Sequence, residues 1–534
     1  MRRLFLLISL LLLPSVAFGE EEIIKQIKSP LIANLPKPPA DRPEIASIKM
    51  LVTTSNEEAQ RHVRIGLNHL LGFWDLEAYR HFVIAAEADP DCPMAYWGIC
   101  VSLATPGPTF QAERIASFKR LKALIEADVG TELERQLAGA LAALYSQGPK
   151  VSGSLLTLTA ETHRAAVLPG ILACMLLRDG YDEFGEALEG QQTALKFMDE
   201  QAERHADVPA VRFYQAALLE QSSEMTKGLR LAEEVLELAP DYPPYNYLVG
   251  YYRLRNGDYK GSAQALQNAV DHYRNYIEEQ KIPMTLMPEY HRALNLLAIA
   301  RDLSGAPEAA LELAQEWTKV DLKDSEITHP GASNILWQNR TLAARLHLSH
   351  EDFKSAIASL PGPRERFKLE GKTSAEAMWH HLRQYAEGRQ AVLDGDLPLA
   401  RRFLPVISKF SEKLAKGQAD AMKRGAFNEW LRFSQLFLQL EDQLRAAISE
   451  AEGGDSLDSA RIWLKAATDK VGIFELLNPP LLSRPPQVDW VDLELLRNDP
   501  EAAKEALESG FESWPNHPEL LRRKDSATEN VAPQ

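Results

Sequence analysis

A recurring spacing of small and large apolar residues constrains the fold of this chain more than any other feature of its sequence. In the first copy Ala78 is followed by Phe82, Ala85 and Pro90, at intervals of four, three and five residues. A small residue lets two helices approach closely, and a large residue one turn later fills the seam beside it. Similar pairs recur at Ser262 and Leu266, Ala356 and Leu360, and Ala400 and Leu404, with a looser copy at Ala310 and weaker ones at Ala460 and Ala503.

Glycines recur between the two helices of several copies. Gly257, Gly305 and Gly395 suit the left-handed position that ends a helix, and Asp258 and Asp396 can cap the helix that follows. Any helical bundle can contain one such seam, but aligned copies with glycine at the same turn predict an array of stacked antiparallel helix pairs. From Ser262 onward, successive copies are 43 to 60 residues apart, so longer helices or insertions must separate them.

The spacing matches the second half of a tetratricopeptide repeat (TPR). Residues 72–98, reading GFWDLEAYRHFVIAAEADPDCPMAYWG, resemble the opening repeats of exported bacterial TPR proteins, a group without an assigned activity. Residues 205–275 and 425–515 resemble them more loosely. The resemblance implies an all-α, right-handed superhelical solenoid that binds a partner protein without naming it. Relatives often carry a histidine-rich middle stretch, and the corresponding segment, Val208–Tyr252, holds no histidine.

The N-terminal segment has the pattern of an export signal. Arg2 and Arg3 precede an apolar run, and small residues lead to Gly19, which is typical of a Sec-type signal peptide cleaved after Gly19. A membrane anchor is the alternative, but the run is short and Pro14 interrupts it. We therefore expect a periplasmic or secreted protein with no transmembrane segment after cleavage. The expected divisions are a signal peptide (1–19), an extended Pro-rich leader (20–45), N-terminal helical repeats (46–227), central TPR-like repeats (228–420), C-terminal TPR-like repeats (421–523) and a disordered tail (524–534).

The net charge limits the classes of possible partner, and the cysteine content limits the possible disulfides. The 75 acidic and 59 basic residues give a net charge of −16, and no basic block stands against it, so we expect no nucleic-acid partner. Three cysteines are too few for a disulfide scaffold. Cys92 and Cys100 are too far apart along a helix to be bridged, so we expect buried free thiols here and at Cys174.

Motifs for catalysis, metal or cofactors are weak. Gly371-Lys372-Thr373 lacks the rest of a phosphate-binding loop. His347 and His350, the adjacent His380 and His381, and Glu326 with His329 do not supply three ligands at fixed spacing. We therefore assign no catalytic residue, no metal and no cofactor, and an activity is less expected than binding.

The first helix of each TPR pair conventionally lines a concave groove, which the family resemblance carries over to this chain. Arginine pairs well with carboxylates, and tyrosine offers rigid contact area. We therefore expect the groove to bind another exported or envelope protein through an acidic peptide segment or chain terminus. The alternative for these residues is solvation or pairing with neighbouring acids. The groove candidates are Trp97, Tyr247, Tyr251, Arg292, Asn295, Arg345, Tyr385 and Arg389.

Two other functions stay open. An exported enzyme on a helical scaffold, for instance one acting on polysaccharides, would use aromatic residues for sugar stacking, and Trp379, Trp430 and Trp463 are the residues to consider. Core packing is the simpler explanation for each of them. The third possibility is a module that positions a separately encoded enzyme.

Overall fold

The computed structural model of the protein is all-helical. Apart from one isolated bridge between Tyr181 and Ala187, no described residue pairs as a β-strand. This confirms the predicted all-α class. The structure describes residues 20–104, 110–181, 186–220, 222–318, 338–360, 362, 373–423, 430–475 and 482–529. The predicted signal peptide lies outside them, as do Glu326, His329 and the Gly371-Lys372 pair.

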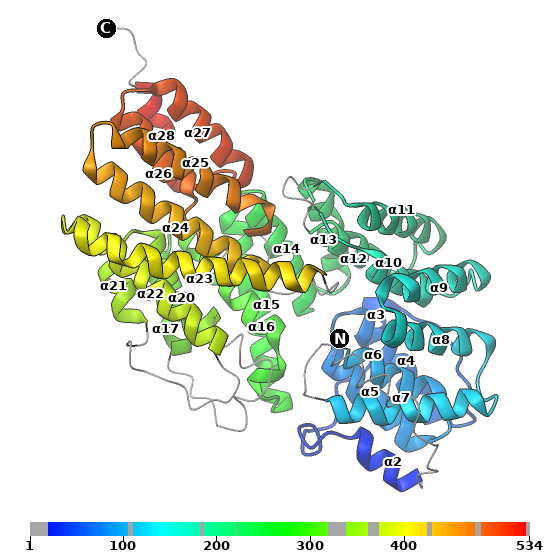
Figure 1. Ribbon diagram of the computed structural model, residues 1–534. Coiled ribbons are helices and arrows are strands. Elements are labelled where there is room, and N and C mark those ends of the chain that lie inside the picture. Colours follow the sequence, from blue (N-terminus) through cyan, green and yellow to red (C-terminus); the bar gives the residue numbers. More distant parts are fainter. Residues whose placement is uncertain are drawn as a thin grey trace. The chain divides into compact units, whose positions relative to one another are not determined.

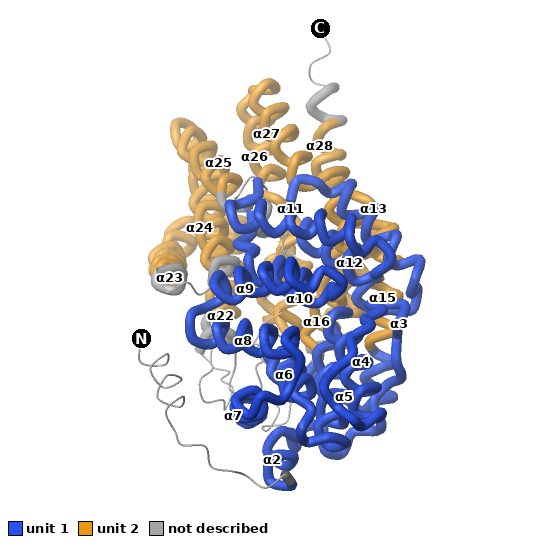
Figure 2. The backbone as a smooth tube through the Cα atoms, turned by 90° about the vertical axis from the view of Figure 1, so that its right-hand side faces the viewer, with its two compact units in different colours: residues 1–181, 186–245, 274–286 blue, residues 182–185, 246–273, 287–534 orange. Residues whose placement is uncertain are grey.

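The chain divides into two compact units, drawn in blue and orange in Figure 2. The first takes in residues up to 181, then 186–245 and 274–286. Its helices, labelled in Figure 1, are α2 (Glu20–Ile27), α3 (Pro43–Ala46), α4 (Glu57–Leu71), α5 (Asp75–Ala88), α6 (Pro93–Ser102), α7 (Gln111–Glu126), α8 (Glu132–Gln147), α9 (Pro149–Thr162), α10 (Val167–Leu177), α11 (Glu189–Arg204), α12 (Pro209–Leu218) and α13 (Met225–Leu238). The short helix η1 (Met284–Leu286) also belongs to it.

The second unit takes in residues 246–273 and everything described after 286. Helices α14 (Pro243–Arg255) and α15 (Tyr259–Gln280) contribute residues to both units. The remaining helices are α16 (Pro288–Leu303), α17 (Pro307–Thr318), α20 (Leu342–Ser349), α21 (Phe353–Ser359), α22 (Thr373–Leu393), α23 (Leu397–Lys423), α24 (Trp430–Glu452), α25 (Ser456–Glu475), α26 (Pro486–Leu496), α27 (Pro500–Ser513) and α28 (Pro518–Glu529). Several of these are long, which accounts for the wide spacing between copies of the sequence signature.

Consecutive helices pack on one another as antiparallel hairpins, through the residues that the signature predicts. The ring of Phe82 lies against Gly66 of α4 and Gly98 of α6, so that a Cβ at Gly66 would come within 2.9 Å of it. In the second unit a Cβ at Gly250 would meet Leu266 at 2.5 Å. Small residues at these points are therefore required by close helix packing, and the TPR-like seam is confirmed.

The turns between paired helices also follow the prediction. Gly257, Gly305 and Gly395 have φ values of 76°, 90° and 77°, in the left-handed region. Asp258 and Asp396 accept backbone N–H bonds from the first turn of α15 and α23, at 2.9 and 3.0 Å. Each hairpin thus ends one helix and starts the next within three residues.

The segment expected to be an extended leader is partly helical. Its first eight residues form α2, in which Ile23 and Ile27 are buried, and the Tyr79 hydroxyl donates to the Ile27 carbonyl at 2.7 Å. The prolines that suggested an extended chain all lie after α2. At the other end, the expected tail continues α28 as far as Glu529. The predicted boundaries between the repeat regions stay a prediction.

The three cysteines are buried and unbridged, as expected: Cys92, Cys100 and Cys174. Burial raises the pKa of each thiol to about 12. Such thiols stay protonated at neutral pH and are poor nucleophiles.

Candidate functional site

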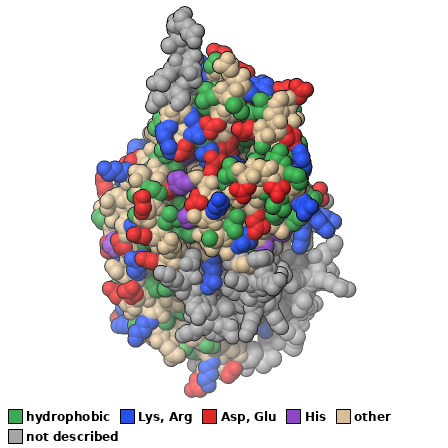
Figure 3. Space-filling model, turned by 90° about the vertical axis from the view of Figure 1, so that its left-hand side faces the viewer, with side chains coloured by type: hydrophobic (Ala, Val, Ile, Leu, Met, Phe, Trp, Pro, Cys, Tyr) green, Lys and Arg blue, Asp and Glu red, His purple; other side chains and the backbone are tan. Residues whose placement is uncertain are grey.

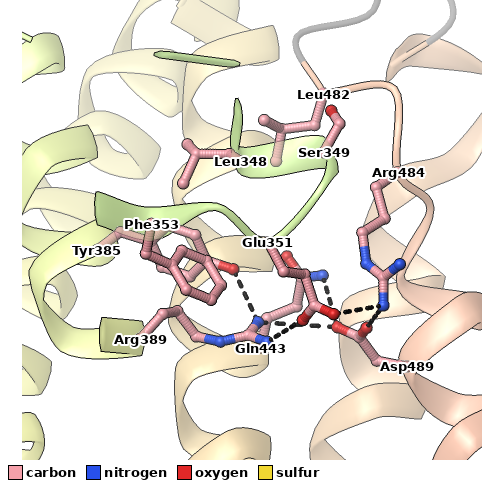
Figure 4. Close-up of a pocket in the computed structure, with 10 residues that line it drawn as sticks. All are labelled: Leu348, Ser349, Glu351, Phe353, Tyr385, Arg389, Gln443, Leu482, Arg484 and Asp489. Carbon is pink, nitrogen blue, oxygen red and sulfur yellow. Dashed lines mark hydrogen bonds and ion pairs between the residues drawn. The ribbon is translucent and has the colours of Figure 1, made fainter. Parts of the chain in front are cut away.

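A small pocket in the second unit collects four charged residues from segments far apart in the sequence (Figure 4). Its walls come from the end of α20, the turn before α21, the middle of α22 and of α24, and the start of α26. Its cavity volume is about 10 Å³, room for about one water molecule. Leu348, Phe353 and Leu482 supply apolar walls, so that the charged groups meet beside a surface of low polarity.

Two arginines and two carboxylates alternate around this pocket. Arg389 donates to Oε1 of Glu351 at 2.8 Å, and its other terminal nitrogen lies 3.7 Å from Oδ2 of Asp489. Arg484 donates to Oδ1 of Asp489 at 2.6 Å and lies 3.2 Å from Oε2 of Glu351. Each carboxylate therefore joins both guanidinium groups, and the four charges cancel.

The surroundings hold these groups in their charged forms. Burial alone would raise the pKa of Asp489, but Arg484 and Arg389 outweigh it, and the pKa lies below its ordinary value. Burial raises the pKa of Tyr385, whose hydroxyl accepts a bond from Arg389 at 3.0 Å. The Arg389 guanidinium also stacks over the ring of Phe353, 4.9 Å from its centre.

Two polar atoms beside the pocket are buried without a hydrogen-bond partner among the described residues. They are Nε of Arg484 and Oε1 of Gln443. The amide nitrogen of Gln443 faces Asp489 at 3.4 Å. A donor and an acceptor left over next to paired charges give this pocket spare hydrogen-bonding capacity for a polar ligand.

Glu351 occupies an unusual backbone position. Its φ is 57°, in the left-handed region, at the turn where Gly257, Gly305 and Gly395 stand in other pairs. A residue with a Cβ is disfavoured there by about 1 kcal/mol or more. Such strain persists where the surrounding structure holds the residue in place, and the bonds from Glu351 to the two arginines contribute to this. The carboxylate side chain is 40% exposed, which makes it the most accessible charge of the four.

The structure brings together two of the eight predicted groove residues at this pocket, Tyr385 and Arg389. It brings together two more in a separate buried cluster, where Arg345 donates to Oδ1 of Asn295 at 2.5 Å and to the Gln338 carbonyl at 2.7 Å. All four of these side chains are largely buried. Arg389 is paired with neighbouring acids, which is the alternative to groove binding that the sequence left open.

The other four candidates are scattered. Trp97 is buried in the first unit, where its indole N–H donates to the Leu137 carbonyl at 3.3 Å. Tyr251 is buried, and Arg255 donates to its hydroxyl at 3.3 Å. Tyr247 and Arg292 are half-buried in the second unit. The concave groove stays a prediction.

Sequence reasoning missed Glu351, Arg484 and Asp489. The last two come from far along the chain and carry no motif. Glu351 did carry a signal, since it replaces the glycine of three sister turns. Gln443 lies in the middle of α24, and its position carried no sequence signal.

Metal-binding groups were considered as well. The described residues contain no cluster of three or more His, Cys, Asp or Glu side chains that could hold a metal ion. His350 pairs with Asp302 at 2.6 Å, and His347 lies 3.4 Å from Asp352. Each of these histidines is thus held by one carboxylate, as a structural pair would be.

Three further histidines of the first unit, His62, His69 and His81, are stacked inside the hairpin of α4 and α5. Nδ1 of His62 and Nδ1 of His81 are 2.8 Å apart, and all three rings are buried. Burial lowers the pKa of His69 to about 4 and that of His81 to about 3. Because these pKa values lie well below 7, the rings are neutral at neutral pH, and within the His62–His81 pair one Nδ1–H donates to the other Nδ1.

Comparisons with known proteins add little to this picture. No protein-family model and no curated protein matches the chain. Among solved structures it is similar to Naa15/Naa10 bound to HypK-THB (12% identity, 88% of this chain and 86% of that chain, TM-score 0.25), to the TPR domain of P58(IPK) (10%, 75% and 98%, TM-score 0.20) and to yeast Tom70 (10%, 89% and 89%, TM-score 0.30). Because these TM-scores are low, the description of the fold rests on the seams and turns above. No helix among the described residues is long and apolar enough to cross a membrane.

Proposed function

We propose that the protein is an exported, TPR-like scaffold whose second unit binds a carboxylate of a partner protein. The pocket of Glu351, Arg389, Arg484 and Asp489 is the observation that carries the proposal. Glu351 reaches the two arginines from a strained turn and is the most exposed of the four groups. It therefore acts as an internal stand-in for the carboxylate of an acidic segment or chain terminus.

Binding exchanges one carboxylate for another. The partner's carboxylate takes the place of Glu351 between the two guanidinium groups, while Asp489 remains and keeps one of their charges neutralised. Nε of Arg484 then gains an acceptor. A bidentate guanidinium–carboxylate contact supplies both energy and geometry, which suits recognition of a chain terminus.

The test is fluorescence anisotropy with a labelled acidic peptide that has a free C-terminus. Glu351→Gln removes the competing charge, so its affinity for the peptide should rise about tenfold, the scale of one charged hydrogen bond. Arg484→Gln should lower the affinity by a similar factor. Asn498→Gly changes the corresponding turn of another pair and should leave it unchanged. Equal affinities of wild type and Glu351→Gln, both folded by circular dichroism, would refute the proposal.

Export is tested separately. The mature protein should begin at Glu20 and be recovered outside the cytoplasm, which N-terminal sequencing of the fractionated protein measures. Protein that still begins at Met1 and stays in the cytoplasmic fraction would contradict the proposed export.

Neither carboxylate that lines this pocket supports the enzyme alternative. A glycosidase needs one carboxyl group with a raised pKa to act as acid. Asp489 has a lowered pKa, and Glu351 is bonded to both arginines. Trp379 is fully buried, as core packing requires.

A further inference from the structure

The outer face of α23 carries a stripe of cations. Figure 1 shows α23 (yellow) as one of the longest helices of the second unit. It packs mainly against α22 and α24, through buried residues such as Ile407, Phe410 and Leu414. On the opposite side Arg402, Lys409, Lys413 and Lys416 are all exposed.

These four cations lie on one line. At 100° per residue their side chains fall within a sector of about 60°, and they span roughly 21 Å of helix axis. Two exposed aliphatic side chains, Leu399 and Val406, extend the same sector to about 100°. Their exposed fractions are 38% and 39%. The stripe is therefore basic with apolar side chains between the charges.

No ion pair among the described side chains neutralises this stripe. None of its four cations forms an ion pair with a described side chain, whereas the neighbouring Arg401 pairs with Glu452. Glu412 is exposed at the edge of the stripe without an ion pair to the lysines beside it among the described groups. From α24, Glu441 is held by Arg445 at 2.7 Å and by Ser408 at 2.5 Å.

Such a face is unusual on this protein. The chain has a net charge of −16, and in the view of Figure 3 acidic and basic side chains are interspersed. Like charges at neighbouring helix positions repel and destabilise an isolated helix. A merely solvated face would mix the two signs, as in an ordinary exposed helix. The stripe is thus a surface that an anionic partner would stabilise.

We propose that the outer face of α23 docks the protein onto an anionic lipid surface. The outer side of a single helix is convex and can lie against a membrane, where it offers no groove to enclose a peptide. Three of the four cations are lysines, compact point charges that suit a diffuse layer of headgroups better than bidentate recognition. Leu399 and Val406 can enter the headgroup region between them. The attachment is peripheral and is independent of the carboxylate pocket.

Co-sedimentation of the full mature chain with vesicles tests this inference. One vesicle preparation contains phosphatidylcholine alone, and the other contains about one third phosphatidylglycerol. The wild type should sediment with the anionic vesicles only, and less at high salt. Each cation near such a surface contributes about 1 kcal/mol, or roughly fivefold in affinity. Changing all four to Gln should therefore weaken binding more than a hundredfold.

A matched variant controls for total charge. It changes four exposed cations elsewhere in the second unit to Gln: Lys260, Lys354, Lys504 and Arg522. This variant has the same net charge as the stripe variant and should sediment like the wild type. Loss of binding in both variants, or no binding of the wild type, would overturn the proposal. So would binding of polyglutamate through the stripe without vesicle binding, which would assign it to an acidic protein.

Discussion

Two turns of the second unit have the same backbone and different residues. Before α21 the left-handed residue is Glu351, and before α23 it is Gly395. In both, its N–H donates to the carbonyl three residues back, at 3.1 and 3.0 Å. In both, the next residue is an aspartate, Asp352 or Asp396, that caps the following helix. The fold therefore does not need the glutamate.

The difference between Gly395 and Glu351 distinguishes the residue that the repeat turn requires from the additional contacts that this helix pair makes. Gly395 has open space around it, and a Cβ there would meet nothing within 4 Å. Glu351 carries backbone strain but delivers a carboxylate to Arg389 and Arg484. At this pair the departure from glycine thus coincides with a carboxylate that does more than close the hairpin.

Removing Asp489 should give the largest difference in stability between the two turns. Asp489→Ala leaves Arg389 and Arg484 with Glu351 as their common partner in a largely buried site. Loss of one member of a buried ion pair costs about 3–5 kcal/mol, so we expect the free energy of unfolding to fall by that order. Urea denaturation followed by tryptophan fluorescence measures it. Asp394→Ala, at an exposed acid of the other turn, is the control, and equal losses in both would show that the pocket network is not special.

The two turns should respond oppositely to glycine and alanine. Glu351→Ala and Glu351→Gly remove the same ion pairs, but only glycine also relieves the left-handed strain. The glycine variant should therefore be the more stable by about 1 kcal/mol. Gly395→Ala introduces the strain without a clash and should lose a similar amount. If Glu351→Ala and Glu351→Gly unfold at the same urea concentration, the strain is absent.

A third member of the series adds a clash to the strain. A Cβ at Gly257 would run into the backbone carbonyl of Pro515, which cannot move away like a flexible side chain. Gly257→Ala should therefore cost more than Gly395→Ala, by about 1 kcal/mol or more. Equal losses would mean that the contact with Pro515 relaxes freely.

Much of this local structure could be predicted from the sequence. The small and large residues of the seams, the glycines of the turns and the capping aspartates each act within one hairpin, and each was found where the spacing put it. Phe82 between Gly66 and Gly98 is the clearest case. The helix α2 was missed because prolines that follow it dominated the composition of the segment.

The site could be predicted only in part. Tyr385 and Arg389 were selected by their register, but the register could not show that Asp489, a hundred positions later, folds back onto Arg389. Asn295 and Arg345 were selected by the same rule and proved to be buried partners of each other. Register gives the face of a helix, whereas burial depends on the neighbour that covers that face.

The histidine of the strained turn gives a smaller, pH-dependent difference. His350 precedes Glu351, and its hydrogen bond to Asp302 raises its pKa despite partial burial. Because the folded pKa is raised, this stabilisation is complete below the unfolded value of about 6.5 and is lost as the pH rises through the folded value. The side chain is 47% exposed, so we expect less than about 1 kcal/mol. Wild type and His350→Gln should therefore differ in stability at pH 5.5 and converge at pH 9, and a constant difference would contradict the pairing.

We expect the smallest change in stability at the turn before α27, which has neither a glycine nor a neighbouring pocket. Asn498, before α27, has a φ of 58°, and asparagine tolerates this conformation well. Asn498→Gly should change the free energy of unfolding by less than about 0.5 kcal/mol and leave peptide binding unchanged. A gain as large as that of Glu351→Gly over Glu351→Ala would mean that any side chain is equally strained at these turns. The glutamate would then not be distinguished by its backbone, and its role would rest on its two arginines alone.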